Sequence, residues 1–202
     1  MTQIHEHALG LTWVMDEAME RASHALVDDA GRVWLIDPVD DPQAMERAVA
    51  LGEPAGVLQL LDRHKRDCAA IAQRLGVPQL TVPGALPEAP FTVQRVVHNW
   101  LWREVALWWP AKRALVVAEA LGTTPAFAVG PGPVGIHPML RARPPHGLKG
   151  LNPEHLLVGH GPPVSGPDVG AAVDTAIDHA WRDTPRLLVK LPSLIKETLR
   201  PS

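Results

Sequence analysis

Residues 60–78 read LLDRHKRDCAAIAQRLGVP, and the interpretation of the whole chain starts from this stretch. Leu60 and Leu61 end an apolar run typical of a buried strand, and the charged residues 62–67 form a turn. Residues 67–76 place apolar side chains at helical spacing and end at Gly76, which predicts an amphipathic helix. Because a rigid sheet holds the side chains that such a turn exposes, the turn is a candidate for an active site.

The same strand and helix signals alternate through the first half of the chain. The apolar runs 24–29 and 32–37 flank a turn-rich link and predict a β-hairpin. Residues 40–52 predict a helix, with Asp41 as its N-cap, Pro42 in its first turn and Gly52 as its stop. The runs 56–61 and 79–83 predict strands on either side of the helix 67–76. This β-α-β rhythm predicts a mixed α/β fold.

The second half continues the pattern around one irregular segment. Residues 91–102, 104–109, 113–122 and 155–164 predict strands, and residues 169–181 predict a helix with Asp168 as its cap. Residues 122–147 are rich in Gly and Pro, so we expect a long irregular loop over one edge of the fold.

Length, composition and charge exclude several classes of protein. A chain of 202 residues with 46% hydrophobic content and seven Trp predicts a single globular domain, residues 1–202. The net charge of −3 comes from interspersed acids and bases, which argues against nucleic acid as a partner. No apolar run approaches the ~18 residues of a membrane span. Cys68 is the only cysteine, and the first residues lack the pattern of a signal peptide, so we expect a cytoplasmic protein without an intrachain disulfide.

Four segments, in this order, resemble the metallo-β-lactamase fold superfamily, which includes glyoxalase-II-like thioester hydrolases. VWLIDPVDD resembles the early strand that ends in an Asp turn, and residues 60–78 resemble the main metal loop with its helix. RALVVAEALG is similar to the segment that carries a bridging aspartate, and LLVGHGPPV to the segment of the last histidine ligand. The resemblance covers nearly the whole chain and implies a four-layer αββα sandwich.

The resemblance implies that the first of the family's two metal positions is lost. The family's His-x-His-x-Asp-His motif falls on residues 63–68, which places Arg63 and Lys65 where the leading histidines stand. Its next histidine falls near Trp100, although a shift of two residues would bring His98 there. Protonated cationic side chains have no lone pair for a metal, so Arg63 and Lys65 would instead supply fixed positive charge or hold an anion.

The second metal position keeps donor atoms under the same alignment. Its members would be Asp67, Cys68 in place of a histidine, Glu119 in place of the bridging aspartate, and His160. Oxygen, sulfur and nitrogen donors of this kind suit zinc or another divalent ion. With one ligand position left to water, the set would form a mononuclear hydrolytic site.

Each of these residues also has a purely structural interpretation. Asp67 is placed to cap a helix, and Cys68 to pack as a small apolar residue. Glu119 could end an exposed strand edge, and His160 could line a turn between two glycines. His64 is offset from the ligand pattern, which favours a surface position. Four tryptophans near the predicted strands could form core contacts or wall a substrate pocket: Trp100, Trp102, Trp108 and Trp109.

Two functions remain open at this point. The first is a hydrolase-like relative without binuclear zinc catalysis, which acts as a non-catalytic binding or assembly module with a protein partner or a second copy. The second is a mononuclear metal-dependent hydrolase of an ester, thioester or lactone. Fold similarity cannot choose between them, because the chemistry depends on the site.

Overall fold

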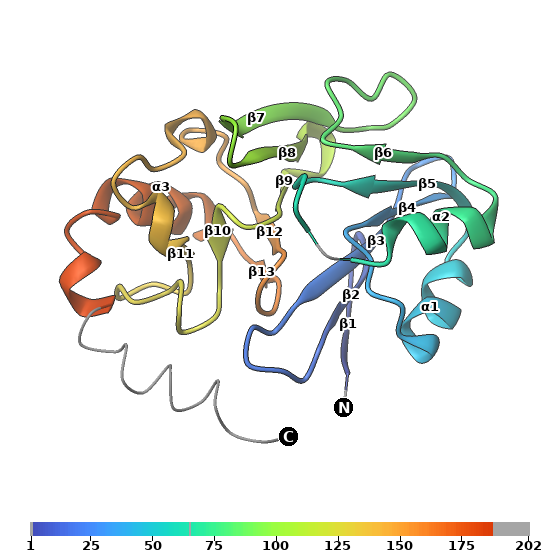
Figure 1. The fold of residues 1–202 in the computed structure, drawn as a ribbon, viewed down its shortest axis with the longest axis horizontal. Coiled ribbons are helices and arrows are strands. Elements are labelled where there is room, and N and C mark those ends of the chain that lie inside the picture. The colour runs from blue at the N-terminus through green and yellow to red at the C-terminus, as the bar shows by residue number, and fades with distance from the viewer. Residues whose placement is uncertain (1, 65, 188–202) are drawn as a thin grey trace.

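The computed structural model describes residues 2–64 and 66–187, which form two β-sheets with helices on their outer faces (Figure 1). The first sheet has six strands in chain order: β1 (Gln3–His7), β2 (Gly10–Val14), β3 (Ala22–Val27), β4 (Arg32–Ile36), β5 (Glu53–Gln59) and β6 (Gln79–Thr81). The second has the order β13 (Val164–Ser165), β12 (His155–Val158), β9 (Ala114–Val117), β8 (Arg103–Trp109) and β7 (Thr92–His98). The two short strands β10 (Leu121–Gly122) and β11 (Gly135–Ile136) pair with each other.

The helices begin and end close to the predicted positions. α1 spans Pro42–Val49, and Asp41 caps it by accepting a hydrogen bond from the Ala44 amide at 2.9 Å. α2 spans Cys68–Leu75 and ends at Gly76, whose φ of 68° is the left-handed conformation that glycine adopts without strain. α3 spans Val169–His179. Three short 3₁₀ helices complete the set: η1 (Pro110–Lys112), η2 (Pro138–Leu140) and η3 (His146–Leu148).

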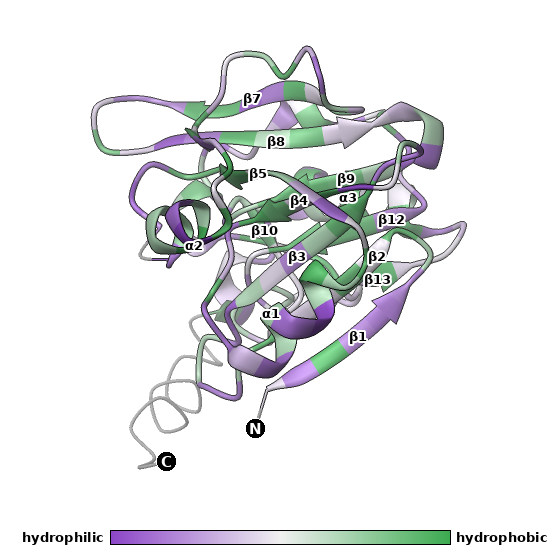
Figure 2. Cartoon of the chain, turned by 90° about the vertical axis from the view of Figure 1, so that its right-hand side faces the viewer, coloured by the Kyte–Doolittle hydropathy of each residue, from purple (hydrophilic) through white to green (hydrophobic). Residues whose placement is uncertain are grey.

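The predicted hairpin of residues 24–37 is confirmed as the antiparallel pair β3–β4, and β5 and β6 lie parallel on either side of α2 in sequence. The preceding hairpin β1–β2 was not predicted from the sequence. Its outer strand β1 is mostly hydrophilic, whereas the central strands β4 and β9 are hydrophobic (Figure 2). β1 forms one edge of the sheet and buries no residue completely, so it carries little of the alternating pattern by which strands are recognised.

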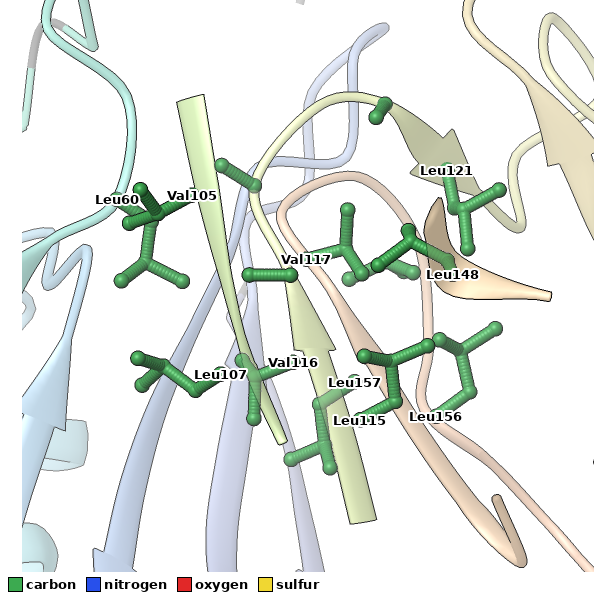
Figure 3. Close-up of a cluster of buried hydrophobic side chains, with 14 of the residues drawn as sticks. Leu60, Val105, Leu107, Leu115, Val116, Val117, Leu121, Leu148, Leu156 and Leu157 are labelled. Carbon is green, nitrogen blue, oxygen red and sulfur yellow. The ribbon is translucent and has the colours of Figure 1, made fainter. Parts of the chain in front are cut away.

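Two apolar clusters hold the layers together. Leu35 and Val57 of the first sheet pack against α1 and α2 through side chains such as Met45 and Ile71. The opposite face of the same strands, together with the second sheet and α3, forms the larger cluster, part of which Figure 3 shows. Its members include Leu26, Ile36, Leu58, Leu107, Leu115, Val116, Leu156, Val169, Val173 and Ile177. The order helix, sheet, sheet, helix confirms the predicted αββα sandwich.

The sheets bring three loops to one edge. β9 and β12 are parallel neighbours, with Val117 opposite Val158, so the residues after both strands leave the sheet at the same end. The residues after β5 join them because Leu61 forms an isolated bridge with Glu104 of β8. The loops after Leu61, Val117 and Val158 therefore meet.

Candidate metal centre

The meeting loops bring together three side chains that can bind a metal ion. His64, Glu119 and His160 each offer one donor atom, and these three atoms lie within 4.8 Å of one another. The Glu119 Oε1 atom lies 3.3 Å from His160 Nε2 and 3.4 Å from His64 Nε2. Tetrahedral zinc with ligands at about 2.0–2.1 Å separates neighbouring donors by about 3.3 Å. The cluster therefore has the donor types and two of the spacings of a zinc site.

His160 has one orientation fixed by its surroundings. Its Nδ1 atom lies 2.7 Å from the Met19 carbonyl oxygen, which can only accept, so Nδ1 carries a proton and donates. In the neutral ring, Nε2 then presents a lone pair to the Glu119 carboxylate. Two acceptors at 3.3 Å repel each other unless a proton or a metal ion lies between them. Metal-bound histidines are commonly oriented by such a bond from the second ring nitrogen.

His64 lies between two carboxylates. Its side chain is 5% exposed, with Nδ1 at 3.3 Å from Asp37 Oδ2 and Nε2 at 3.4 Å from Glu119 Oε1. Burial alone would lower the pKa of His64, but the two carboxylates raise it to about 9. Both nitrogens lie at ion-pair distance, yet neither meets hydrogen-bond geometry. Their surroundings thus favour a cation in this position, whether it is the protonated ring or a metal bound by it.

Asp37 supports His64 from a fixed position at the end of β4. Its Oδ1 atom accepts a hydrogen bond from the Leu60 amide at 3.2 Å, and its backbone N–H donates to Leu58 at 2.9 Å. The backbone of Asp37 has a φ of 45°, which is uncommon for a non-glycine residue. Asp37 thus stands behind the His64 ring, on the side away from Glu119. In metalloproteins, a carboxylate in this position commonly orients the histidine that binds the metal.

Glu119 is held through its backbone by a second, fully buried carboxylate. Glu104 Oε1 accepts from the amides of Glu119 and Ala120 at 2.9 Å each, and its Oε2 accepts from Trp102 Nε1 at 2.8 Å. Burial raises the pKa of Glu104 to about 7 despite these three bonds. At Glu119, burial also acts to raise the pKa, but His160 and His64 hold it well below its usual range.

Two further groups face this cluster and were not assigned to it from the sequence. His137 Nε2 lies 3.8 Å from Glu119 Oε2, and its Nδ1 accepts from the Met139 amide, so the neutral ring carries its proton on Nε2. Arg66 donates to the Gly159 carbonyl at 3.0 Å, beside His160, and burial lowers the pKa of its guanidinium. The sequence offered only one signal for His137, which was its position between Ile136 and Pro138 in the Gly- and Pro-rich loop.

The structure places the predicted ligands in two different environments. Glu119 and His160 lie in the donor cluster, whereas Asp67 and Cys68 lie outside it. Asp67 Oδ2 accepts a hydrogen bond from the Asp40 amide at 2.8 Å. Cys68 is buried in the cluster beneath α1 and α2, where desolvation raises the pKa of its thiol well above the usual value. The expectation of a surface position for His64 is wrong, because the loop turns its ring inward.

The residues aligned with the first metal position do not converge on this cluster. Arg63 is largely exposed and lies over the Trp102 ring, 5.9 Å from its centroid. Lys65 lies outside the described residues. His98 and Trp100 are exposed, the latter at 89%. Of the other tryptophans, Trp102 and Trp109 are buried core side chains and Trp108 is partly buried.

Comparison with known proteins shows the fold. No family model matches the sequence, and no curated protein matches it. Among solved structures, DIM-1 metallo-β-lactamase exposed to ceftazidime has a TM-score of 0.58 at 11% identity, covering 89% of this chain and 97% of that one. The mono-zinc form of the metallo-β-lactamase FIM-1 from Pseudomonas aeruginosa has a TM-score of 0.58 at 7% identity, covering 89% and 96%.

A third solved structure, TTHA1623 in a di-iron-bound form, has a TM-score of 0.52 at 17% identity, covering 75% of this chain and 93% of that one. At these identities the likeness shows the fold alone. The chain has the metallo-β-lactamase fold, as the order of its sequence segments predicted. None of the helices within residues 2–64 and 66–187 is long and apolar enough to cross a membrane.

Proposed function

From the metallo-β-lactamase fold and the donor cluster, we propose that this chain is a hydrolase-like protein that binds one divalent metal ion through His64, Glu119 and His160. The observation that carries the proposal is the convergence of three donor atoms within 4.8 Å, with Asp37 at ion-pair distance behind His64 and the Met19 carbonyl bonded to His160. Two imidazoles and one carboxylate are the ligand types of catalytic zinc sites, which keep one position open for water. Asp67 and Cys68 are not part of the proposed set.

A single ion distinguishes this proposal from the two-metal chemistry implied by the resemblance. Arg63 and Trp100 stand outside the cluster, so the described residues offer no second set of donors around it. A bound divalent ion would lower the pKa of its water ligand and polarise a substrate carbonyl. The side chains around it keep separate tasks: Asp37 and the Met19 carbonyl orient the two imidazoles, and His137 points its Nε2–H toward Glu119.

The substrate class that we propose is an ester, thioester or lactone. These acyl compounds carry a good leaving group, so one activated water with one electrophilic ion can suffice for their hydrolysis. The Nε2–H of His137 lies on the Glu119 side of the cluster and could donate to an oxygen that gains negative charge. This assignment makes His137 a catalytic residue by virtue of its position, a role the sequence did not suggest.

A second candidate, a non-catalytic binding or assembly module, is favoured by the charges of the same site. A protonated His64 between Asp37 and Glu119, with the buried Arg66 nearby, would balance both carboxylates without any metal. In that state the proton competes with the metal for His64. Metal uptake therefore separates the two candidates.

The test is metal analysis of protein purified without chelator, followed by calorimetric titration of the apo-protein with zinc. We expect one ion per chain, lost in His64→Asn, Glu119→Gln and His160→Asn. Cys68→Ser is the matched control, because a cysteine outside the cluster should leave zinc uptake unchanged. A parent protein that takes up no zinc would contradict the metal site and support the binding module. Equal loss in Cys68→Ser would instead restore the ligand set expected from the sequence.

Hydrolysis is tested on the zinc-loaded parent with a panel of aryl esters, acyl thioesters and lactones. We expect metal-dependent turnover that falls about 10²–10⁴-fold in His137→Gln, the range for losing a proton-donating side chain, while zinc affinity is retained. Zinc uptake without any turnover would favour a metal-binding module over a hydrolase.

A further inference from the structure

We propose a second binding site, for a small anion with a phosphate group, in a cavity between the edges of the two sheets. The cavity has a volume of about 240 Å³. Thr81, Val82, Pro83 and Gly84, which end β6 and follow it, line one side. Residues of the β7–β8 hairpin line the other side: Arg95, His98, Arg103, Glu104 and Val105. In Figure 1 this hairpin lies beside β6 at the top of the molecule.

The cavity is separate from the donor cluster, although the two share β8. Successive side chains of a strand point to opposite faces, so Arg103 and Val105 project away from the face that carries the Glu104 side chain. Glu104 directs its carboxylate toward the backbone of Glu119. The proposed anion site therefore does not depend on metal binding or on the proposed hydrolase activity.

A β-bulge brings the basic side chains to one face. Arg95 pairs with Val105 and His98 pairs with Arg103, while the register shifts between Arg95 and Val97. In a regular strand, residues 95 and 98 would point to opposite faces. The extra residue puts Arg95 and His98 on the same face, opposite two β8 residues that also share a face. Without this bulge, Arg95 and His98 would not lie on the same face of the hairpin.

Other side chains engage these polar groups only in part within the described part of the chain. Arg103 Nε donates to Asp62 Oδ2 at 3.0 Å, whereas the Arg95 and His98 side chains make no hydrogen bond or ion pair there. Thr81 Oγ1 accepts from Gln79 at 3.4 Å, which leaves the hydroxyl proton free to donate to a ligand. Arg95, His98, Arg103 and Thr81 thus line the same small cavity, and the side chain of each carries hydrogen-bond donors.

The opposite wall is held in a strained backbone conformation. Val82 has a φ of 45°, in the left-handed region that β-branched residues avoid. Its amide donates to the Gln59 carbonyl at 2.7 Å, which fixes the turn as the chain leaves β6. Strained residues of this kind concentrate at ligand sites, where the surrounding fold holds them in place.

These features select a compact oxyanion. Guanidinium groups match the oxygen geometry of phosphate and carboxylate, and two of them favour a dianion over a monoanion. The volume of about 240 Å³ accommodates inorganic phosphate or the phosphate group of a small ester, but not a nucleotide bound whole.

The test is calorimetric titration of the full chain with inorganic phosphate and, separately, with glycerol 3-phosphate, in EDTA so that no metal contributes. We expect saturable binding of one anion per chain that weakens at least about tenfold in Arg95→Gln and in Arg103→Gln. Arg47→Gln on α1 is the matched control, because it removes an exposed arginine that is not among the residues lining the cavity. Glu119→Gln should bind phosphate like the parent, which separates this site from the donor cluster.

Binding of both probes would identify free phosphate as a sufficient ligand, and binding of the ester alone would identify a phosphorylated small molecule. Absence of binding by both probes at millimolar concentrations would overturn the proposal. Equal weakening in Arg47→Gln would overturn it as well, because the effect would then reflect general surface charge. If Arg103→Gln fails to fold, Arg95→Gln still decides, since Arg95 is exposed and its side chain makes no hydrogen bond or ion pair within the described residues.

Discussion

A buried chain of hydrogen bonds runs through His24. Because protonation of His24 would disrupt this chain, we expect acid to lower the stability of the folded protein. His24 Nε2 donates to the Val158 carbonyl at 3.2 Å, so Nδ1 must accept from Thr12 Oγ1, at 2.9 Å. Thr12 in turn accepts from His7 Nε2 at 3.0 Å. The chain of hydrogen bonds therefore runs from His7 to Thr12 to His24 to the Val158 carbonyl, and each group donates its proton to the next. This arrangement requires both imidazoles to be neutral. A proton added to His24 Nδ1 would face the Thr12 hydroxyl and break this order.

The size of the effect follows from the pKa of His24. Burial, with a smaller contribution from the charge of His7, lowers it from 6.5 to about 3. Between these pH values the unfolded chain binds more protons than the folded one, so this contribution is complete above pH 6.5 and is lost as the pH falls. Two pH units at ~1.4 kcal/mol each predict a loss of ~3 kcal/mol by pH 4.5. His7, whose pKa burial lowers to about 4, acts in the same direction.

The assay is urea unfolding of the parent and His24→Gln at pH 7.5 and pH 4.5, with EDTA present. Glutamine can accept from Thr12 and donate to Val158 but cannot titrate. We expect His24→Gln to be about 1 kcal/mol less stable at pH 7.5 and to lose ~3 kcal/mol less on acidification, so that it overtakes the parent. Thr12→Val, which keeps the histidine and its burial, should retain the acid sensitivity of the parent. Parallel pH profiles for the parent and His24→Gln would refute the reasoning.

Three further substitutions test hydrogen bonds and packing that hold the fold and the donor cluster. Glu104→Gln places an amide N–H against Trp102 Nε1–H, and urea unfolding at pH 5 should show a loss of about 1–3 kcal/mol; unchanged stability would contradict the three hydrogen bonds. Gly161→Ala puts a Cβ 2.3 Å from Thr123 Oγ1 at a φ of +100°, so calorimetry should show weaker zinc binding by the adjacent His160. Gly132→Ala, whose Cβ meets no atom within 4 Å and whose φ lies outside the left-handed region, should bind zinc normally. Trp109→Ala should lower the free energy of unfolding by about 3–5 kcal/mol in urea, because the Trp109 side chain is fully buried. Trp100→Ala should lower it by less than about 0.5 kcal/mol, because Trp100 is exposed. Similar losses in the two variants would contradict these positions.

Most of the fold could be predicted from the sequence, because its strands and helices carry strong local signals. Asp41 with Pro42 marks the start of α1, and Gly76 the end of α2, through backbone chemistry that does not depend on the rest of the fold. The β1–β2 hairpin was missed because an edge strand with few buried side chains loses the alternation that identifies strands.

The candidate site was predicted only in part. Glu119 and His160 follow regular strands, β9 and β12, so the ends of these strands fix where the two side chains lie. His64 lies in an irregular loop, where side-chain direction is set by long-range contacts. The bonds from the Asp67 amide to Pro38 and from the His64 amide to Leu61 shape this loop, and no periodicity in the sequence reports them.

Cys68 had two interpretations in the sequence, as a metal ligand and as a small apolar residue. A thiol beside an aspartate in a loop that resembles a metal motif looks like a ligand, but the first turn of α2 directs it into the apolar layer with Ile71 and Met45. Helix geometry, which the sequence does predict, already placed Cys68 and Ile71 on one face, three residues apart. The buried position of Cys68 agrees with its interpretation as a small apolar residue.

X-ray absorption spectroscopy of the zinc-loaded protein tests the central claim most directly, because it reports the ligand atoms themselves. The site of His64, Glu119 and His160 predicts one zinc surrounded by nitrogen and oxygen at about 2.0–2.1 Å, with the multiple-scattering pattern of two imidazoles and no sulfur. A zinc–sulfur shell at about 2.3 Å would show that Cys68 is a ligand after all and would contradict the account.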